Sequence, residues 1–217
     1  MKTSGKKYGV VRFPGTNCDQ DIFEFVTAKG YQAEWLWHQD SFSWQNYEAV
    51  ILPGGFSYGD YLRSGALAAR SPVMGSLREG ASHGLPVLGI CNGFQILCES
   101  GLLPGALVKN AHLNFIDQWV NLKLENSPSH FAKTYKKGET ICLPIAHGDG
   151  RFFAPADHLK KIEDDGLVWL RYEENPNGSL NDIAGVFNKQ KNVAGLMPHP
   201  ERALYDWMGG FQGWDFI

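Results

Sequence analysis

The strongest constraint on the fold of this chain is the segment Gly89-Ile90-Cys91-Asn92-Gly93, which ends a short apolar run. A reactive side chain between two glycines at this spacing is typical of a nucleophile elbow, here with sulfur in place of a serine oxygen. The elbow is a tight turn from a strand into a helix, and the glycines leave room for it. We therefore expect Cys91 at the carboxyl edge of a sheet and at the start of a helix, where the helix dipole favours a thiolate.

Apolar runs alternate with segments of helical periodicity in the first half of the chain. The expected strands are 9–13, 31–37, 49–52 and the run before Cys91. The expected helices begin near residue 19, span about 59–83 with an interruption near Pro72, and follow Cys91. This alternation predicts a three-layer α/β fold, a mostly parallel open sheet with helices on both faces. Ligands bind at the carboxyl ends of the strands in such a sheet.

The pattern changes after about residue 114, where strands follow one another with few helices between them. The expected strands in this part are 118–124, 140–144, 167–172 and 183–188. Such a run of strands indicates an antiparallel extension of the same domain. A further strand is expected at 193–197, directly before Pro198-His199-Pro200-Glu201. With 217 residues, the chain is expected to form a single domain over residues 1–217.

Composition argues against several classes of function. The net charge is −3 without a long basic run, which disfavours nucleic-acid binding. No apolar stretch approaches the roughly 20 residues of a membrane span, and the basic amino end lacks the apolar region of a secretory signal. The four cysteines are scattered, which indicates free thiols in a reducing, cytoplasmic compartment and makes a zinc site unexpected.

A cysteine nucleophile needs a base, and the base needs an acceptor that orients it. The segment Pro198-His199-Pro200-Glu201 offers both. A residue before a proline is pushed towards an extended backbone, in which residues i and i+2 point to the same side. We therefore expect Glu201 to hold one ring nitrogen of His199 while the other nitrogen faces Cys91.

An oxyanion hole is the third part of such a site. One donor is expected to be the backbone N–H of Asn92, the residue after the nucleophile. A second is expected from Gly54 or Gly55, where the absence of a side chain lets the backbone approach a substrate. Gln95 lies one helical turn after Cys91 and is expected either to contact a bound amide or to support the loop.

Two other features admit competing interpretations. Gly55-Phe56-Ser57-Tyr58-Gly59 also has the spacing of a serine elbow, but Pro53-Gly54 separates Ser57 from its strand. We therefore expect Ser57 to grip a substrate rather than to act as the nucleophile. His147 stands in the glycine-rich segment Ala146–Arg151, where it either lines the site or caps a turn. Local pairs are expected for Asp149 and Arg151, and packing roles for Cys18, Cys98 and Cys142.

The segments Pro53–Gly55, Gly89–Gln95 and His199–Glu201 together resemble the motifs of the class I glutamine amidotransferases. The resemblance implies a flavodoxin-like fold and the hydrolysis of glutamine to glutamate and ammonia through a γ-glutamyl thioester. It also implies roles for individual residues. The catalytic triad would be Cys91, His199 and Glu201, and the glutamine and its oxyanion would be held by Gly54, Gly55, Ser57, Asn92 and Gln95.

Further segments narrow the resemblance, which covers essentially the whole chain. Phe13–Asp19, Pro53–Arg63, Ile145–Phe152 and Gly195–Arg202 are similar to the separate glutaminase subunits of the phosphoribosylformylglycinamidine synthase family. This implies that ammonia passes to a separate large synthetase subunit, with a small accessory subunit in the same complex. The synthetase would use ATP and Mg to convert formylglycinamide ribonucleotide to formylglycinamidine ribonucleotide in de novo purine biosynthesis. This chain itself is expected to need no cofactor.

Two other hypotheses fit the same residues. One is a stand-alone cysteine or serine hydrolase of the same fold, either peptidase-like or an esterase that uses Ser57. The other is a binding or regulatory module that has kept the fold, against which the intact triad argues. The aromatic carboxyl end, Trp207–Ile217, either packs on the core or meets a partner, and packing is the expected outcome.

Overall fold

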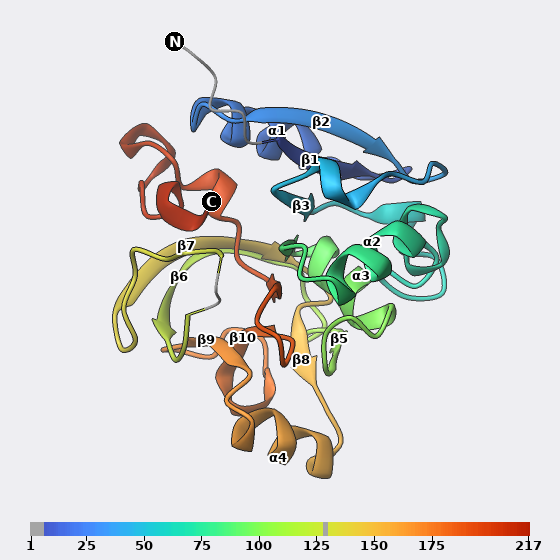
Figure 1. Cartoon of the computed structure of the whole chain (residues 1–217). Coiled ribbons are helices and arrows are strands. Elements are labelled where there is room, and N and C mark those ends of the chain that lie inside the picture. Colours follow the sequence, from blue (N-terminus) through green and yellow to red (C-terminus); the bar gives the residue numbers. More distant parts are fainter. Residues whose placement is uncertain (1–6, 128–129) are drawn as a thin grey trace.

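The computed structural model describes residues 7–127 and 130–217. Within these residues nine strands form one sheet in the order β2-β1-β3-β4-β11-β10-β9-β6-β7 (Figure 1). The strands of this sheet are β1 Lys7–Arg12, β2 Gln32–Trp37, β3 Ala49–Leu52, β4 Val87–Ile90, β6 Ile116–Leu124, β7 Thr140–His147, β9 Val168–Tyr172, β10 Ile183–Phe187 and β11 Val193–Leu196.

The two halves of the sheet differ in strand direction. The strands β2, β1, β3, β4 and β11 pair in parallel, whereas β10, β9, β6 and β7 join the sheet by antiparallel pairing. Every residue of β3, β4 and β11 is buried, so both faces of the sheet are covered at its centre, because successive residues point to opposite faces. The predicted α/β sheet with an antiparallel extension is confirmed.

Helices pack on both halves of the sheet. The α-helices in the described ranges are α1 Asp19–Ala28, α2 Val73–Ser82, α3 Asn92–Glu99 and α4 Ala156–Asp164. Single 3-10 turns occur at Trp44–Asn46, Ser57–Asp60, Ala68–Arg70, Leu180–Asp182, Pro200–Arg202, Asp206–Met208 and Trp214–Phe216. The helix α1 packs on β1 and β2, and α3 packs on β3, β4 and β11. Over residues 7–127 and 130–217, no helix has the length and apolar character needed to cross a membrane.

The predicted helix over about residues 59–83 is wrong in its first part. Only the residues after Pro72 form an α-helix, and the chain before it makes short turns. The reason is backbone geometry: Tyr58, Gly59, Asp60 and Leu62 have φ values of 55°, 66°, 54° and 70°. A right-handed helix cannot contain residues in this left-handed region.

Sequence patterns also missed three short elements. The strands β5 (Ala106–Val108) and β8 (Arg151–Phe153) form a separate two-stranded sheet, and each is too short to show alternation. The helix α4 has only a short apolar stripe, in which Ile162 is buried and Leu159 packs partly buried against the core. Polar contacts add to this small apolar contact.

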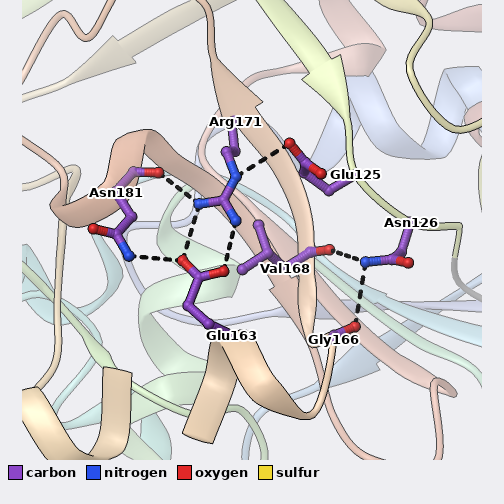
Figure 2. Close-up of polar contacts among 7 residues, drawn as sticks. All are labelled: Glu125, Asn126, Glu163, Gly166, Val168, Arg171 and Asn181. Atoms are coloured by element: carbon purple, nitrogen blue, oxygen red, sulfur yellow. Dashed lines mark hydrogen bonds and ion pairs between the residues drawn. The ribbon is translucent and has the colours of Figure 1, made fainter. Parts of the chain in front are cut away.

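A polar network around Arg171 of β9 attaches α4 to the antiparallel half (Figure 2). The Arg171 guanidinium donates to both carboxylate oxygens of Glu163 on α4, at 3.1 and 2.6 Å, and to Glu125 at 3.2 Å. It also donates to the carbonyl oxygen of Asn181 at 2.7 Å. Paired donors of this kind hold a carboxylate in one orientation, which helps to fix the helix beside β9.

The aromatic carboxyl end packs on the core, as expected. Phe216 is fully buried, and its ring centre lies 5.7 Å from that of Trp169. The ammonium group of Lys29 donates to the carbonyl oxygen of Trp214 at 2.9 Å. Trp207 and Phe211 remain on the surface, 79% and 62% exposed.

The central strands bring three distant segments to one edge of the sheet. The strands β3, β4 and β11 are parallel neighbours, and their register pairs Leu52 with Gly89 and Ile90 with Leu196. Their carboxyl ends therefore lie together. The segments that follow them, Pro53–Gly55, the elbow at Cys91 and the turn after Leu196, leave the sheet side by side.

The first turn of α3 lies so close to β3 that Gly93 has no room for a side chain. A methyl group on Gly93 would lie 1.9 Å from the carbonyl oxygen of Leu52. We predict that Gly93→Ala lowers the free energy of unfolding by about 3 kcal/mol or prevents folding. Gly75→Ala on α2 is the matched control, because nothing lies within 4 Å of the added carbon. The free energy of unfolding of this control, measured by urea unfolding, should rise by about 1 kcal/mol. Equal stability of Gly93→Ala and wild type would contradict the close approach.

Candidate active site

Cys91 lies at the turn between β4 and α3 in a strained backbone, with φ 52° and ψ −106°. Such a conformation costs a non-glycine residue about 1–3 kcal/mol and is found mainly at functional sites. A methyl group on Gly89 would lie 2.7 Å from the carbonyl oxygen of Gly93, so the turn needs both glycines. The strand, turn and helix expected around Cys91 are all present.

Cys91 is held between two other segments of the chain. The backbone N–H of Cys91 donates to the carbonyl oxygen of Leu196 at the end of β11, at 2.8 Å. Its sulfur lies 3.8 Å from the carbonyl oxygen of Ala146 on β7. The side chain is at the start of α3, where the first N–H groups have no acceptor within the helix.

His199 and Glu201 form a buried pair, each 1% exposed, with 2.6 Å between His199 Nδ1 and Glu201 Oε1. The predicted contact is present, but the extended backbone expected to produce it is not. His199 has φ −108° and ψ 88°, and Pro200–Arg202 forms a 3-10 turn that carries the carboxylate back to the ring. Because the carboxylate accepts from Nδ1, the second nitrogen, Nε2, is left for another partner.

Two opposing effects set the pKa of His199. Burial disfavours the charged ring and would lower the pKa. The Glu201 carboxylate and the neighbouring Cys91 thiol outweigh burial and raise it to about 10. His199 therefore holds a proton near neutral pH. An imidazolium beside the elbow is the partner that stabilises a cysteine thiolate.

Gly54 shows how close the side chains of Cys91 and His199 lie. A methyl group on Gly54 would be 2.8 Å from His199 Cε1, 3.4 Å from Cys91 Cβ and 3.1 Å from Cys18 Sγ. The three side chains thus converge on one glycine at the end of β3. His199 Nε2 is buried and makes no hydrogen bond among the residues that the structure describes.

The donors expected for an oxyanion flank the same point. Gly55 has a φ of 141°, and a methyl group there would lie 2.7 Å from the backbone nitrogen of Asn17. Only glycine fits this combination of conformation and space. Asn92 is the first residue of α3, so its N–H is one of the helix donors without an intrahelical acceptor. The geometry is compatible with the predicted pair of backbone donors.

The side chains of Asn92 and Gln95 join three segments of the site. Asn92 Oδ1 accepts from the backbone N–H of Ser57 at 3.1 Å, and Asn92 Nδ2 donates to Gln95 Oε1 at 2.8 Å. Gln95 Nε2 in turn donates to the carbonyl oxygen of Asp149 at 2.7 Å. Of the two roles expected for Gln95, support of a loop is therefore the one that the hydrogen bonds show. The structural use of the Asn92 side chain was not predicted.

A cavity of about 280 Å³ opens beside the thiol. Cys91, His199, Gly55 and Gln95 contribute to its wall, together with Asn17, Cys18, Phe56, Asp60, Ser64, Phe115, Ala146, His147, Gly148, Asp149 and Arg202. Its lining does not include Gly54, Ser57, Asn92 or Glu201.

Ser57 is placed differently from the expected substrate contact. It is 2% exposed, and its hydroxyl is buried without a hydrogen-bond partner among the described residues. Its backbone N–H binds Asn92 instead. Ser57 does not form a nucleophile elbow, because it lies in a 3-10 turn away from the end of its strand. The structure thus gives Ser57 a place behind the cavity wall.

His147 lines the cavity, one of the two roles considered for it. Asn110 Oδ1 accepts from the backbone N–H of Gly150 at 3.2 Å and lies 3.1 Å from His147 Nδ1. An amide oxygen can only accept, so Nδ1 carries the proton and Nε2 keeps a lone pair. Burial and the nearby His199 lower the pKa of His147 to about 4, which keeps the ring neutral.

Sequence reasoning missed the charged residues of the cavity wall. Asp60 and Asp149 both line the cavity. Within the described residues, the Asp149 side chain makes no local pair: its Oδ2 accepts from the distant Ser64 hydroxyl at 2.8 Å. Both carboxylates stand beside glycines in loops that follow β3 and β7. A search for acidic residues in those glycine-rich loops would have found them.

Cys18 and Arg202 form a second unpredicted cluster. Arg202 donates to Cys18 Sγ at 3.0 Å, and its Nε lies 3.7 Å from Asp21 Oδ2. Burial raises the pKa of the Cys18 thiol, so it stays protonated. Ligand atoms of Cys18, His199 and Glu201 lie within 4.8 Å of one another. A metal ion there would compete with the His199–Glu201 hydrogen bond and face the Arg202 guanidinium, so the cluster suits a metal poorly.

Comparisons with known proteins agree in one family. The model of the CobB/CobQ-like glutamine amidotransferase domain matches residues 6–212. A structure of PurLQS from Thermotoga maritima contains a chain that is 44% identical, with a TM-score of 0.88, covering 97% of this chain and 94% of that one.

Two more distant structures share the fold. A glutamine amidotransferase from Thermotoga maritima is 18% identical with a TM-score of 0.62, covering 92% of this chain and 78% of that one. A putative GMP synthase protein from Thermoplasma acidophilum is 17% identical with a TM-score of 0.60, covering 90% and 84%.

The low pKa of His147 has a consequence for stability. The unfolded chain binds a proton at this residue below a pH of about 6.5, whereas the folded protein resists it down to about 4. Stability is therefore lost as the pH falls through this window, by about 2 kcal/mol between pH 7.5 and 5. We predict that His147→Gln removes this part of the pH dependence in urea unfolding. Parallel curves for variant and wild type would show that the pKa of His147 is the same in the folded and the unfolded chain.

Proposed function

The chain belongs to the CobB/CobQ-like glutamine amidotransferase family, and we propose that it is the glutaminase subunit of a phosphoribosylformylglycinamidine synthase. The observation that carries the proposal is the convergence of Cys91 and His199 on Gly54, with Glu201 2.6 Å from the far side of the ring. This is the arrangement of a cysteine nucleophile, its base and the orienting acceptor. The relative at 44% identity supports the narrower assignment.

In the proposed mechanism, the Cys91 thiolate attacks the side-chain amide carbon of glutamine. Backbone N–H groups of Asn92 and Gly55 stabilise the tetrahedral oxyanion. The His199 imidazolium gives its proton to the departing nitrogen, which leaves as ammonia, and a γ-glutamyl thioester remains on Cys91. His199 then takes a proton from water, the resulting hydroxide attacks the thioester, and glutamate leaves as the thiolate forms again. Glu201 holds the ring in one orientation throughout.

The ammonia is used by a partner in this proposal. A separate large synthetase subunit, together with a small accessory subunit, converts formylglycinamide ribonucleotide to its amidine with ATP and Mg. The glutaminase chain needs no cofactor of its own, because thioester chemistry requires only the side chains and backbone donors described above. We further propose that residues 1–217 act as a single catalytic domain in the cytoplasm, where the four free thiols stay reduced.

The position of Ser57 argues against the alternative of a stand-alone serine hydrolase. A serine nucleophile must present its hydroxyl to the substrate, yet the Ser57 hydroxyl is buried and outside the cavity lining. A cysteine hydrolase without a synthetase would share the triad. A stand-alone hydrolase would not pass ammonia to a synthetase. The presence of a synthetase partner therefore distinguishes a glutaminase subunit from a stand-alone cysteine hydrolase.

Replacement of the nucleophile is the first test. Cys91→Ala should lower glutamine hydrolysis by at least about 1,000-fold. The complex co-purified with the synthetase should still make the amidine from added ammonia. A glutamine-analogue diazo-ketone should label Cys91, glutamine should prevent the labelling, and a fluorophosphonate should leave Ser57 unmodified. Full hydrolysis by the variant would remove Cys91 as the nucleophile.

Replacement of the orienting carboxylate should have a smaller effect with a distinct pH signature. Glu201→Gln should lower kcat by about 10- to 1,000-fold, since thiol and imidazole both remain. Without the carboxylate, burial is unopposed and the pKa of His199 falls. The alkaline limb of the kcat profile should therefore move to lower pH. Unaltered turnover with an unshifted profile would make Glu201 a purely structural residue.

A further inference from the structure

The loop that follows β3 is held by two sets of side-chain contacts. The first comes from α3, where Asn92 Oδ1 accepts from the backbone N–H of Ser57 at 3.1 Å. The second is made by the next residue along the loop: the hydroxyl group of Tyr58 lies 2.7 Å from His38 Nδ1 and 3.1 Å from Ser71 Oγ. Neither His38 nor Ser71 lines the cavity beside the thiol, so Tyr58 ties the loop to residues outside the site.

His38 and Ser71 are fixed points for this contact. His38 directly follows β2 and is 4% exposed, and Ser71 stands just before α2 and is 7% exposed. The backbone N–H of His38 donates to the carbonyl oxygen of Arg12 on β1 at 3.1 Å, and its carbonyl oxygen accepts from the N–H of Val73 on α2 at 3.1 Å. Because His38 is bonded to both elements, it cannot follow a loop that shifts.

The loop needs such an anchor because its backbone is strained. Tyr58, Asp60 and Leu62 have φ values of 55°, 54° and 70°, in the left-handed region that is unfavourable for residues other than glycine. Conformations of this kind persist only where surrounding contacts hold them. The Tyr58 hydroxyl supplies one such contact at the start of the strained stretch.

The strained stretch begins three residues after Gly55, the expected oxyanion donor. Gly55 pairs with Thr16 in an isolated antiparallel bridge, and the backbone N–H of Tyr58 donates to the carbonyl oxygen of Pro14 at 2.6 Å. These backbone bonds join the loop to a second segment that lies outside the regular helices and strands. Two such segments can shift together, whereas the Tyr58 hydroxyl fixes them to the ends of β2 and α2.

The hydroxyl group of Tyr58 can serve both partners at once. A phenol donates one hydrogen bond and accepts another, so it fits between the His38 ring nitrogen and the Ser71 hydroxyl. Both partners are buried, and a buried polar group that loses its partner is unfavourable. The hydroxyl is therefore restricted to one position, and so is the loop that carries it.

We propose that Tyr58, anchored by His38 and Ser71, is a positioning residue that holds the backbone N–H of Gly55 at the point where the oxyanion forms. The inference rests on the proposed glutaminase function. A donor stabilises an oxyanion only if it is already in place when the charge develops, and a shift of the donor weakens its effect. Tyr58 therefore contributes to the rate of attack without touching the substrate.

The test removes the hydroxyl group and keeps the ring. Tyr58→Phe should lower kcat for glutamine hydrolysis by about 10- to 100-fold and leave KM within about twofold, because the lost contact acts on the transition state. Tyr47→Phe is the matched control, since the Tyr47 hydroxyl donates to Glu34 at 3.1 Å and neither residue lines the cavity. This control should keep the wild-type kcat. Unchanged kcat in Tyr58→Phe, or a loss carried entirely by KM, would overturn the proposal.

A second readout separates positioning from general damage to the site. Iodoacetamide alkylates Cys91 by displacing iodide at a saturated carbon, and this reaction forms no oxyanion. Tyr58→Phe should therefore react with iodoacetamide within about twofold of the wild-type rate while its kcat falls. Equal losses in alkylation and in turnover would show that the variant disturbs the thiol itself, and would overturn the proposal.

Ser71→Ala provides the same test if Tyr58→Phe does not fold, as thermal unfolding followed by circular dichroism would show. It keeps the contact of Tyr58 with His38, so kcat should fall by a smaller factor, about threefold or more, and unchanged kcat would count against the proposal. A wild-type chain that hydrolyses no glutamine would contradict the proposed function. An active wild type with an equally active Tyr58→Phe would contradict only the positioning role.

Discussion

The contact between the first turn of α3 and the end of β3 is the constraint on which the site depends. Gly93 lies against the Leu52 carbonyl, and Gly89 lies against Gly93, so strand and helix can meet only through a very short turn. The residue left at the apex is Cys91, in a backbone conformation that few residues other than glycine adopt. Packing of the two elements therefore stabilises the strain that presents the thiol.

Much of the site could be predicted because its key parts are encoded in short local patterns. The glycines around Cys91 dictate the elbow, and the prolines around His199 keep it out of a helix, so the amino-acid pattern alone points to both residues. Both residues follow the ends of apolar runs, which predicted that they lie at the same edge of the sheet. The order of the same runs predicted the parallel centre of the sheet and its antiparallel extension.

The rest depends on interactions that leave no pattern in the sequence. The Asn92 side chain binds a loop some thirty-five residues away, and Glu201 reaches His199 through a 3-10 turn rather than an extended strand. The left-handed residues Tyr58 and Asp60 look helical by composition alone. The apolar stripe of α4 consists mainly of Leu159 and Ile162, which is too short to recognise as a periodic pattern, and the contact of Arg171 with this helix leaves no pattern at all.

The hydrogen bonds of Asn92 and Gln95 also determine how a substrate can enter. They join the loop after β3, the start of α3 and the loop after β7 into one unit, since each segment is bonded to the next. Such a unit opens only if several buried bonds break together. Entry therefore has to occur without separating these walls. Phe56 and Phe115 both line the cavity and are 48% and 56% exposed, so these two rings belong to the part of its wall that also faces solvent.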